Sequence, residues 1–357
     1  MGATAVTSGE ITTGQQDCVL AVNNLSVEFS TYGGVVSAVR GVSYKVHRAE
    51  TLAVVGESGC GKSVSVQALM GLIPMPPGRI TSGSAKLLGR ELIGLSAREI
   101  NRVRGADIGM IFQDPMTSLN PTMRVGDQIA ETLIAHRGMS KKDAFNRAIT
   151  LLDRTRIPAA KQRVKQYPFE FSGGMLQRVM IAMSLACKPA LLIADEPTTA
   201  LDVTIQNQVL ELMKEIQQEE GMAIVLITHD LGVVARMADN VAVMYAGKVV
   251  EAGSVDDIFY RSAHPYTLGL KAAMPSAKRG NHDTLVAIPG SPPDLFAIPR
   301  GCAYAERCPN AMNVCASQDP DTFSCSDQHY ARCWLHHKLA DRPKDGLFTA
   351  EDAGTKA

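Results

Sequence analysis

The chain has 357 residues, 45% hydrophobic and 20% charged, a composition typical of a globular protein with one large or two ordinary domains. Lysine plus arginine and aspartate plus glutamate number 36 each, so the net charge is zero and gives no support to a general nucleic-acid-binding protein. No apolar run reaches the ~18 residues that a membrane-spanning helix needs.

The chain begins with a polar stretch and then two strand-like runs. Residues 1–16 have neither the basic start nor the apolar core of a secretory signal, and we expect a flexible arm. Val19–Phe29 predicts a first strand and Val35–Val46 a second, with a turn at Tyr32 between them. An aromatic side chain ahead of a phosphate-binding loop could stack on a nucleobase. Tyr32 is the candidate, and the alternative is an ordinary surface aromatic in a turn.

The stretch Gly56–Ser63 fits G-x-x-x-x-G-K-[ST], the phosphate-binding loop. A short apolar strand, Thr51–Val55, precedes it, and a helix is expected to begin near Lys62. Glycines let successive N–H groups point at phosphate oxygens, the helix start adds its positive dipole end, and the serine hydroxyl suits Mg²⁺. The residues expected to cradle the phosphates are Gly56, Glu57, Ser58, Gly59, Cys60, Gly61, Lys62 and Ser63.

The next segment joins turns, a strand and a helical insertion. Ile73–Gly83 is rich in proline and glycine and predicts a break after the first helix. Ile108–Phe112 predicts a strand whose end carries Gln113, an amide that can reach Mg²⁺ and an attacking water; an ordinary strand-end hydrogen bond is the alternative. Arg124–Arg156 has helical periodicity and interrupts the strand pattern.

A second candidate anion site opens the following helix, which we expect to run through Ala186. Ser172, Gly173 and Gly174 combine a capping hydroxyl with free N–H groups at a helix start. The tripeptide alone does not exclude a plain capped helix.

Two buried-type strands end in residues suited to phosphate chemistry. Ala190–Asp195 is apolar up to Asp195, whose carboxylate can bind Mg²⁺ through water. The adjacent Glu196 can act as general base towards water, although a solvated turn is the alternative. Ala223–Thr228 is followed by His229, which can donate a hydrogen bond to a γ-phosphate or serve only structurally.

The remaining elements are a helix and a hairpin. Thr198–Asp202 predicts a tight loop into helix Thr204–Glu219. Val241–Tyr245 and Val249–Gly253 predict a closing hairpin, followed by helix Ser254–Tyr260.

The order of these motifs over residues 17–262 strongly resembles the ATP-binding subunit of ABC transporters. The resemblance implies a RecA-like parallel sheet, an antiparallel β subdomain and a helical subdomain at about 116–188. It assigns Gly56–Ser63 as Walker A and Gln113 as the Q-loop. Its remaining assignments are Ser172–Gln177 as the signature, Leu191–Glu196 as Walker B, Ala200–Asp202 as the D-loop, His229 as the switch histidine and Tyr32 as the adenine-stacking residue. Through the signature and D-loop, Gln177 and Asp202 join the nucleotide-binding set, and Met175 stands where the family usually has glutamine.

Narrower motifs are similar to the ATPases of oligopeptide and dipeptide importers. They are Asp114–Pro121, His264–Thr267, Ile288–Leu295 and a cysteine block at the end of the chain. This similarity implies an importer-type C-terminal domain at 263–337, with a flexible tail over 338–357. Some relatives in this branch import nickel or other small solutes.

The resemblance also implies a mechanism and partners. Two ATPase subunits, expected to be unlike, close head to tail around two ATP molecules with Mg²⁺, each ATP lying between Walker A of one and the signature of the other. Two transmembrane permease subunits and an external substrate-binding protein complete the complex at the cytoplasmic face of the bacterial membrane. Because Glu196 and His229 are present, we expect this chain's own Walker site to hydrolyse ATP.

Five of the eight cysteines crowd into residues 302–333. Cys302, Cys308, Cys315 and Cys333 are spaced C-x5-C-x6-C-x17-C, which matches no C-x2-C zinc finger, and Cys325 is left over. Four thiolates can hold a [4Fe–4S] cluster or zinc, or the thiols can be free. The resemblance favours [4Fe–4S]. Three cysteines elsewhere are not expected to be ligands: Cys18, Cys60 and Cys187; the one in the phosphate loop, Cys60, could be alkylated when nucleotide is absent.

Two other classes of function remain open. A soluble ABC ATPase acting on DNA or ribosomes would usually carry paired cassettes or long insertions, and this chain has one cassette. A redox-sensing iron–sulfur protein would not need the complete ATPase set.

Overall fold

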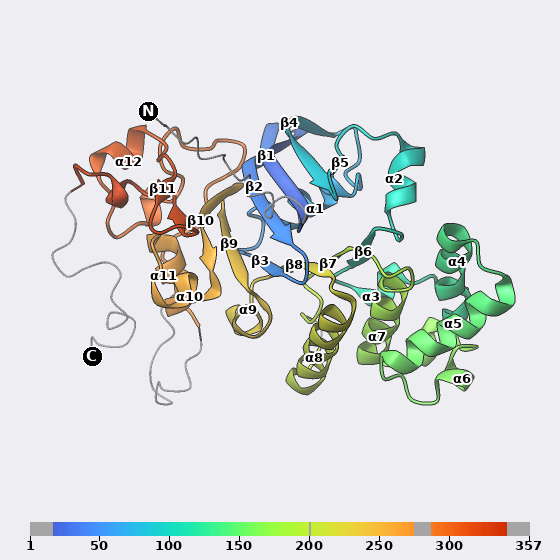
Figure 1. Cartoon of the computed structure of the whole chain (residues 1–357). Helices are drawn as coiled ribbons and strands as arrows, with labels where there is room; N and C mark the ends of the chain where they lie inside the picture. The colour runs from blue at the N-terminus through green and yellow to red at the C-terminus, as the bar shows by residue number, and fades with distance from the viewer. Residues whose placement is uncertain (1–16, 200, 275–286, 341–357) are drawn as a thin grey trace, which may run out of the picture.

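The computed structural model describes residues 17–199, 201–274 and 287–340, in which two sheets lie beside a block of helices (Figure 1). The expected arm, most of the expected tail and Ala200 lie outside the described residues. The two sheets and the helical block match the α/β class that the sequence predicts, with one mainly parallel sheet and one antiparallel sheet.

The larger sheet has eight strands in the order β11-β12-β10-β9-β3-β8-β7-β6. Its centre is parallel: β3 pairs with β8 and β9, β8 with β7, and β7 with β6. These parallel strands are β3 (Thr51–Val55), β6 (Ile108–Ile111), β7 (Leu191–Asp195), β8 (Ala223–Thr228) and β9 (Asn240–Tyr245). All residues of β3, β6, β7 and β8 are buried, as apolar runs covered on both faces should be.

Helices connect these strands. They are α1 (Lys62–Leu69), α8 (Val203–Glu220) and α9 (Leu231–Met237). The first begins at the predicted residue, Lys62. The second is capped by Asp202, whose side chain accepts from Ile205 N, and it ends at Gly221 in the left-handed conformation.

The smaller sheet is antiparallel, in the order β2-β1-β4-β5. Its strands are β1 (Cys18–Thr31), β2 (Gly34–His47), β4 (Gly78–Leu87) and β5 (Arg90–Glu91), and helix α2 (Ala97–Val103) follows. The predicted break over Ile73–Gly83 is therefore wrong in its second half. Residues from Gly78 onward pair with β1, because this antiparallel pairing outweighs the local turn residues.

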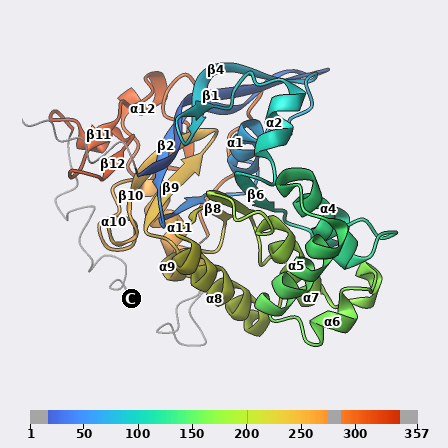
Figure 2. The same cartoon turned by 45° about the vertical axis from the view of Figure 1, so that its right-hand side comes forward.

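The helical block follows β6 and has its own core. Its elements are α3 (Pro115–Ser118), α4 (Val125–Arg137), α5 (Lys141–Arg154), α6 (Ala160–Arg163), η1 (Pro168–Glu170) and α7 (Gly173–Ser184). The helical insertion predicted over Arg124–Arg156 contains two helices, since Gly138 takes a left-handed conformation and Ser140 caps a new helix. Figure 2 shows these helices grouped apart from the antiparallel sheet.

The C-terminal region extends the large sheet. Strand β10 (Lys248–Ser254) pairs with β9 but also with β12 (Tyr330–Ala331), which pairs in turn with β11 (Phe323–Ser324). The hairpin predicted to close the sheet is therefore not its end. The remaining elements are α10 (Val255–Tyr260), α11 (Pro265–Ala272), η2 (Ala305–Arg307), α12 (Asn313–Ser317) and η3 (Trp334–His336). None of the helices in the described residues has both the length and the apolar character needed to span a bilayer.

Candidate functional site

The phosphate loop joins β3 to α1, and its shape depends on two glycines. Gly56 has φ +153° and Gly61 has φ +99°. A Cβ at Gly56 would lie 2.2 Å from the carbonyl oxygen of Met244, and one at Gly61 would lie 2.2 Å from that of Ala38. Both the backbone conformation and the lack of space therefore require glycine.

The cation of the loop is held inside it. Lys62 is 6% exposed, and its Nζ donates to the carbonyl oxygens of Gly56 (2.8 Å) and Glu57 (2.9 Å). A phosphate bound in the loop would therefore compete with these two carbonyl oxygens for the ammonium group. Of the remaining loop residues, Ser58 and Gly59 are partly or fully exposed and Cys60 is buried.

A hydroxyl and a carboxylate meet beside the loop. Ser63 Oγ donates to Asp195 Oδ1 at 2.9 Å, which joins the start of α1 to the end of β7. Asp195 is 7% exposed, and burial raises the pKa of its carboxyl group, with the neighbouring Glu196 acting in the same direction. Buried oxygen atoms of these two kinds suit Mg²⁺, which prefers hard oxygen ligands.

Three side chains from the ends of neighbouring parallel strands converge. Glu196 Oε2 accepts from Gln113 Nε2 at 2.9 Å, and Glu196 Oε1 lies 3.1 Å from His229 Nδ1. Glu196 itself has φ +47°, an uncommon conformation for a residue with a side chain, and Thr199 Oγ1 donates to its Oε2 at 3.0 Å. The candidates Gln113, Glu196 and His229 thus form one cluster at the same sheet edge as the phosphate loop.

The Ser-Gly-Gly segment lies elsewhere, at the start of α7 in the helical block (Figure 1). Ser172 and Gly173 are exposed, and the Ser172 hydroxyl makes no capping hydrogen bond to its own helix. Gln177, also predicted to bind nucleotide, is 1% exposed and turned into the protein, where its Nε2 atom has no hydrogen-bond partner among the described residues. The exposed candidates of this segment are therefore Ser172 and Gly173.

The nucleobase candidate is fully accessible. Tyr32 stands in the turn between β1 and β2 with a relative exposure of 113%. Phe29, at the end of the first predicted strand, packs partly buried against a core that includes the antiparallel sheet.

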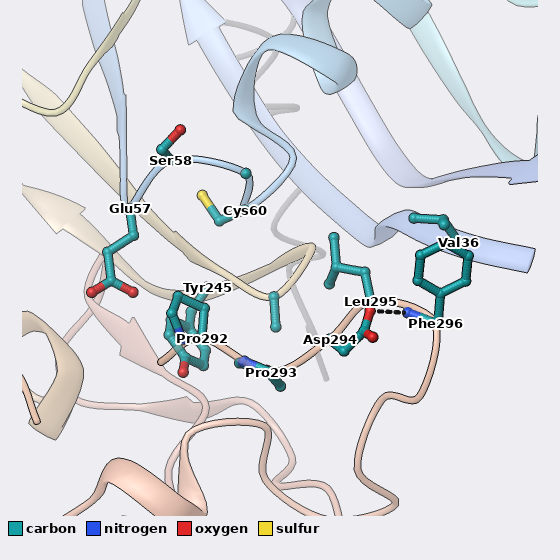
Figure 3. Close-up of a pocket in the computed structure, with 12 residues that line it drawn as sticks. Val36, Glu57, Ser58, Cys60, Tyr245, Pro292, Pro293, Asp294, Leu295 and Phe296 are labelled. Atoms are coloured by element: carbon teal, nitrogen blue, oxygen red, sulfur yellow. Dashed lines mark hydrogen bonds between the residues drawn. The ribbon is translucent and has the colours of Figure 1, made fainter. Parts of the chain in front are cut away.

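A pocket of about 320 Å³ lies between the phosphate loop and the C-terminal region (Figure 3). Its walls include Ser58 and Cys60 on one side and the segment 292–296 on the other. Phe296 would be 3.5 Å from a Cβ at Gly33, so this segment reaches the turn that carries Tyr32. Sequence reasoning missed the wall, because nothing local in Pro292–Phe296 indicates proximity to a loop over two hundred residues earlier.

The four cysteines proposed as ligands influence one another electrostatically. Burial, with smaller contributions from the thiols of Cys302, Cys308 and Cys315, raises the pKa of Cys333 to about 12; burial likewise raises the pKa of Cys302 to about 11. Cys325 is exposed, with its Sγ 3.9 Å from His336 Nδ1. Yet among the residues that the structure describes, no group of three or more His, Cys, Asp or Glu side chains is arranged to hold a metal ion. The expected [4Fe–4S] cluster is thus unsupported by the arrangement of the thiols.

Burial opposes alkylation of the phosphate-loop cysteine. Cys60 is 5% exposed, and burial raises the pKa of its thiol although the nearby Lys62 lowers it. Less thiolate at neutral pH means slower alkylation.

Comparisons with known proteins agree along most of the chain. Residues 39–199 match the ABC transporter family, and residues 250–315 match the family described as oligopeptide/dipeptide transporter, C-terminal region. The oligopeptide transport ATP-binding protein OppD of Bacillus subtilis (strain 168) is 56% identical over 91% of this chain and 90% of that protein. The dipeptide transport ATP-binding protein DppD of the same organism is 54% identical over 90% of this chain and 96% of that protein.

Among solved structures, the dimeric ATP-binding cassette MJ0796 bound to ADP and Pi has a TM-score of 0.60 and 26% identity. The match covers 66% of this chain and 98% of the MJ0796 chain. The cassette thus accounts for about two thirds of the chain, and the C-terminal match accounts for much of the rest. The chain therefore belongs to the ABC transporter family, in the branch of the oligopeptide and dipeptide transport ATP-binding proteins.

Proposed function

We propose that this chain is the ATP-hydrolysing subunit that powers the import of dipeptides and oligopeptides through a membrane complex. The observation that carries the proposal is the convergence of Gln113, Glu196 and His229 on the strand-end edge that also holds the phosphate loop. The relatives named for oligopeptide and dipeptide transport supply the cargo class.

In this proposal each residue of the cluster has one task. Glu196 orients the attacking water and draws off its proton, while His229 and Gln113 hold the carboxylate and then contact the γ-phosphate and the water. Lys62 leaves the loop carbonyls for the β- and γ-phosphates. Ser63 and Asp195 supply oxygen atoms for Mg²⁺, which neutralises charge on the phosphates when bound.

The second half of the site comes from another ATPase subunit, which we propose to be a different chain. Ser172 and Gly173 stand exposed at the start of α7 and would face the partner's nucleotide, and Asp202 would lie at the same seam. ATP favours the closed pair, and hydrolysis removes that preference. Two permease subunits and an external substrate-binding protein complete the importer, with this chain bound peripherally at the cytoplasmic face.

Uptake of a radiolabelled tripeptide into proteoliposomes tests the proposal. The vesicles contain the full complex, with ATP enclosed on the side of this chain. We expect uptake that requires hydrolysable ATP and is lost with Glu196→Gln. Uptake of nickel instead, with none of the peptide, would assign the same motor to another cargo; ATP turnover without uptake of either would contradict the importer role.

We further propose that Cys302, Cys308, Cys315 and Cys333 hold a [4Fe–4S] cluster. Its support is the crowding of five cysteines into residues 302–333 and the chemistry of the four, since four thiolates suit this cluster. Binding would require the side chains to reorient from the arrangement described above. Anaerobic purification should give a brown protein with about four irons per chain; a colourless or zinc-loaded protein would contradict the cluster.

A further inference from the structure

The second residue of the phosphate loop, Glu57, faces away from the phosphate side. Figure 3 shows its carboxylate pointing towards the C-terminal region, opposite to the side chain of Ser58. A carboxylate aimed at a phosphate site would repel the ligand, so turning it outward removes that cost.

Arg307 forms a bidentate ion pair with this carboxylate. Its Nη1 donates to Glu57 Oε2 at 2.7 Å and its Nη2 to Glu57 Oε1 at 2.9 Å. The arginine side chain is 5% exposed and the glutamate 25%. A bidentate pair of this kind fixes direction as well as distance, which a lysine ammonium cannot do.

Arg307 is itself fixed by other contacts. Its Nε donates to the carbonyl oxygen of Pro289 at 2.9 Å and its Nη1 to Tyr245 Oη at 3.2 Å. The guanidinium carbon lies 5.8 Å from the ring centre of Tyr245 and 5.9 Å from that of Tyr304. With these partners the guanidinium has little freedom to turn away from the loop.

The main chain of Glu57 is held by the same region. Its N–H donates to Tyr266 Oη at 2.8 Å, and Tyr266 is wholly buried at the start of α11. The rings of Tyr266, Tyr245 and Tyr304 pack together, with centres 4.5 to 5.4 Å apart. The C-terminal region therefore holds both the side chain and the backbone of one phosphate-loop residue.

We infer that Arg307 is a positioning residue for the nucleotide site, and that through Glu57 it couples the cysteine-bearing segment to the conformation of the phosphate loop. This inference rests on the proposed function and deepens it. Arg307 immediately precedes Cys308, so a change in the cysteine segment moves the guanidinium and with it the loop. The arginine acts through Glu57 and does not touch the phosphates.

The test measures nucleotide affinity of the full-length chain with a fluorescent ATP analogue. Arg307→Gln and Glu57→Gln should each weaken binding about tenfold, and the double variant should be no weaker than the worse single one, because both remove one interaction. Arg307→Lys should recover only part of the loss. Additive losses in the double variant, or unchanged affinity in both single variants, would overturn the inference.

A merely structural role is separated by a control and by a second readout. Arg261→Gln removes an arginine outside the cysteine-bearing segment that pairs with Asp257, and it should leave nucleotide affinity unchanged even if it lowers the melting temperature. ATP binding should slow amide hydrogen exchange over residues 301–309 in the native chain and not in Arg307→Gln, since coupling is reciprocal. Equal slowing in both would contradict the coupling.

If Arg307→Gln does not fold, Glu57→Gln and Arg307→Lys carry the comparison, because each keeps side-chain volume at the contact. Failure here is also distinct from failure of the proposed function. In the assembled complex these variants should raise KM while kcat stays within about twofold, whereas the proposed function depends on ATP turnover that requires Glu196.

Discussion

The side chains at the strand ends and those at the start of α7 differ in whether they have hydrogen-bond partners within the chain. In the cluster every candidate already has a partner within the chain: Ser63 with Asp195, and both Gln113 and His229 with Glu196. At α7, Ser172 and Gly173 are exposed and the serine hydroxyl makes no capping bond. Under the proposed function, the strand-end residues act on this chain's own nucleotide and are pre-organised by the chain, whereas the start of α7 acts on a partner's nucleotide and lacks such contacts.

The largest effect should come from the cluster itself. Glu196→Gln removes the base while keeping the shape, so ATP turnover of the assembled complex should fall at least about a hundredfold, with ATP affinity kept. Glu211→Gln is the matched control, because it neutralises an exposed glutamate on α8 that pairs with Arg236. This variant should leave ATP turnover almost unchanged. Unchanged turnover in Glu196→Gln would place hydrolysis in the partner's site.

A negative charge at the start of α7 should lower ATP turnover only in the assembled complex. A Cβ at Gly173 has no neighbour within 4 Å, so Gly173→Asp fits the folded chain. ATP affinity of the isolated chain should be unchanged, while turnover of the complex should fall more than about tenfold, because a carboxylate would oppose the phosphate. Ala97→Asp puts the same charge at the exposed start of α2 and serves as control. A loss of affinity in the isolated chain would show that α7 serves its own nucleotide.

Tyr32, the exposed aromatic residue of the β1–β2 turn, should contribute to ATP binding by the isolated chain, unlike the start of α7. Tyr32→Ala should weaken ATP binding to the isolated chain about tenfold through lost stacking, and Tyr32→Phe should not. Tyr260→Ala removes another exposed tyrosine and should have no effect. Equal affinity of Tyr32→Ala and the native chain would remove Tyr32 from the site.

The smallest effect concerns pH. Burial raises the pKa of Asp195, so its carboxyl group gains a proton at a higher pH than an exposed aspartate would. Since the Mg²⁺-binding form is the carboxylate, MgATP affinity should begin to fall at that higher pH as the solution is acidified. Isothermal titration across pH measures this, and Asp195→Asn should bind MgATP weakly with a flatter profile. Identical profiles would show that another group controls the loss.

The parts of the site that the sequence predicts are those fixed by parallel pairing. Gln113, Glu196 and His229 each follow a buried apolar strand, and the carboxyl ends of neighbouring parallel strands meet at one edge. Local spacing was also sufficient for the phosphate loop, whose helix begins at Lys62 as expected. Motifs of this kind carry their geometry within a few residues.

Other features depend on contacts that no local pattern encodes. Arg307 and Glu57 are 250 residues apart, and neither residue type indicates the other. Strands β11 and β12 have two residues each, too few for an alternation to be visible. The burial of Gln177 depends on which face of α7 packs inward, and a short motif at the helix start does not determine that face.

The short pairing between β10 and β12 also protects the molecule from its neighbours. Without β12, the seven-residue strand β10 would present unpaired N–H and C=O groups along one edge of the large sheet. The Arg332 N–H, bonded to the carbonyl oxygen of Val250 at 2.8 Å, occupies one such position. A chain cut before residue 323 should therefore self-associate edge to edge. Light scattering should detect this self-association even where ATP binding is still unchanged.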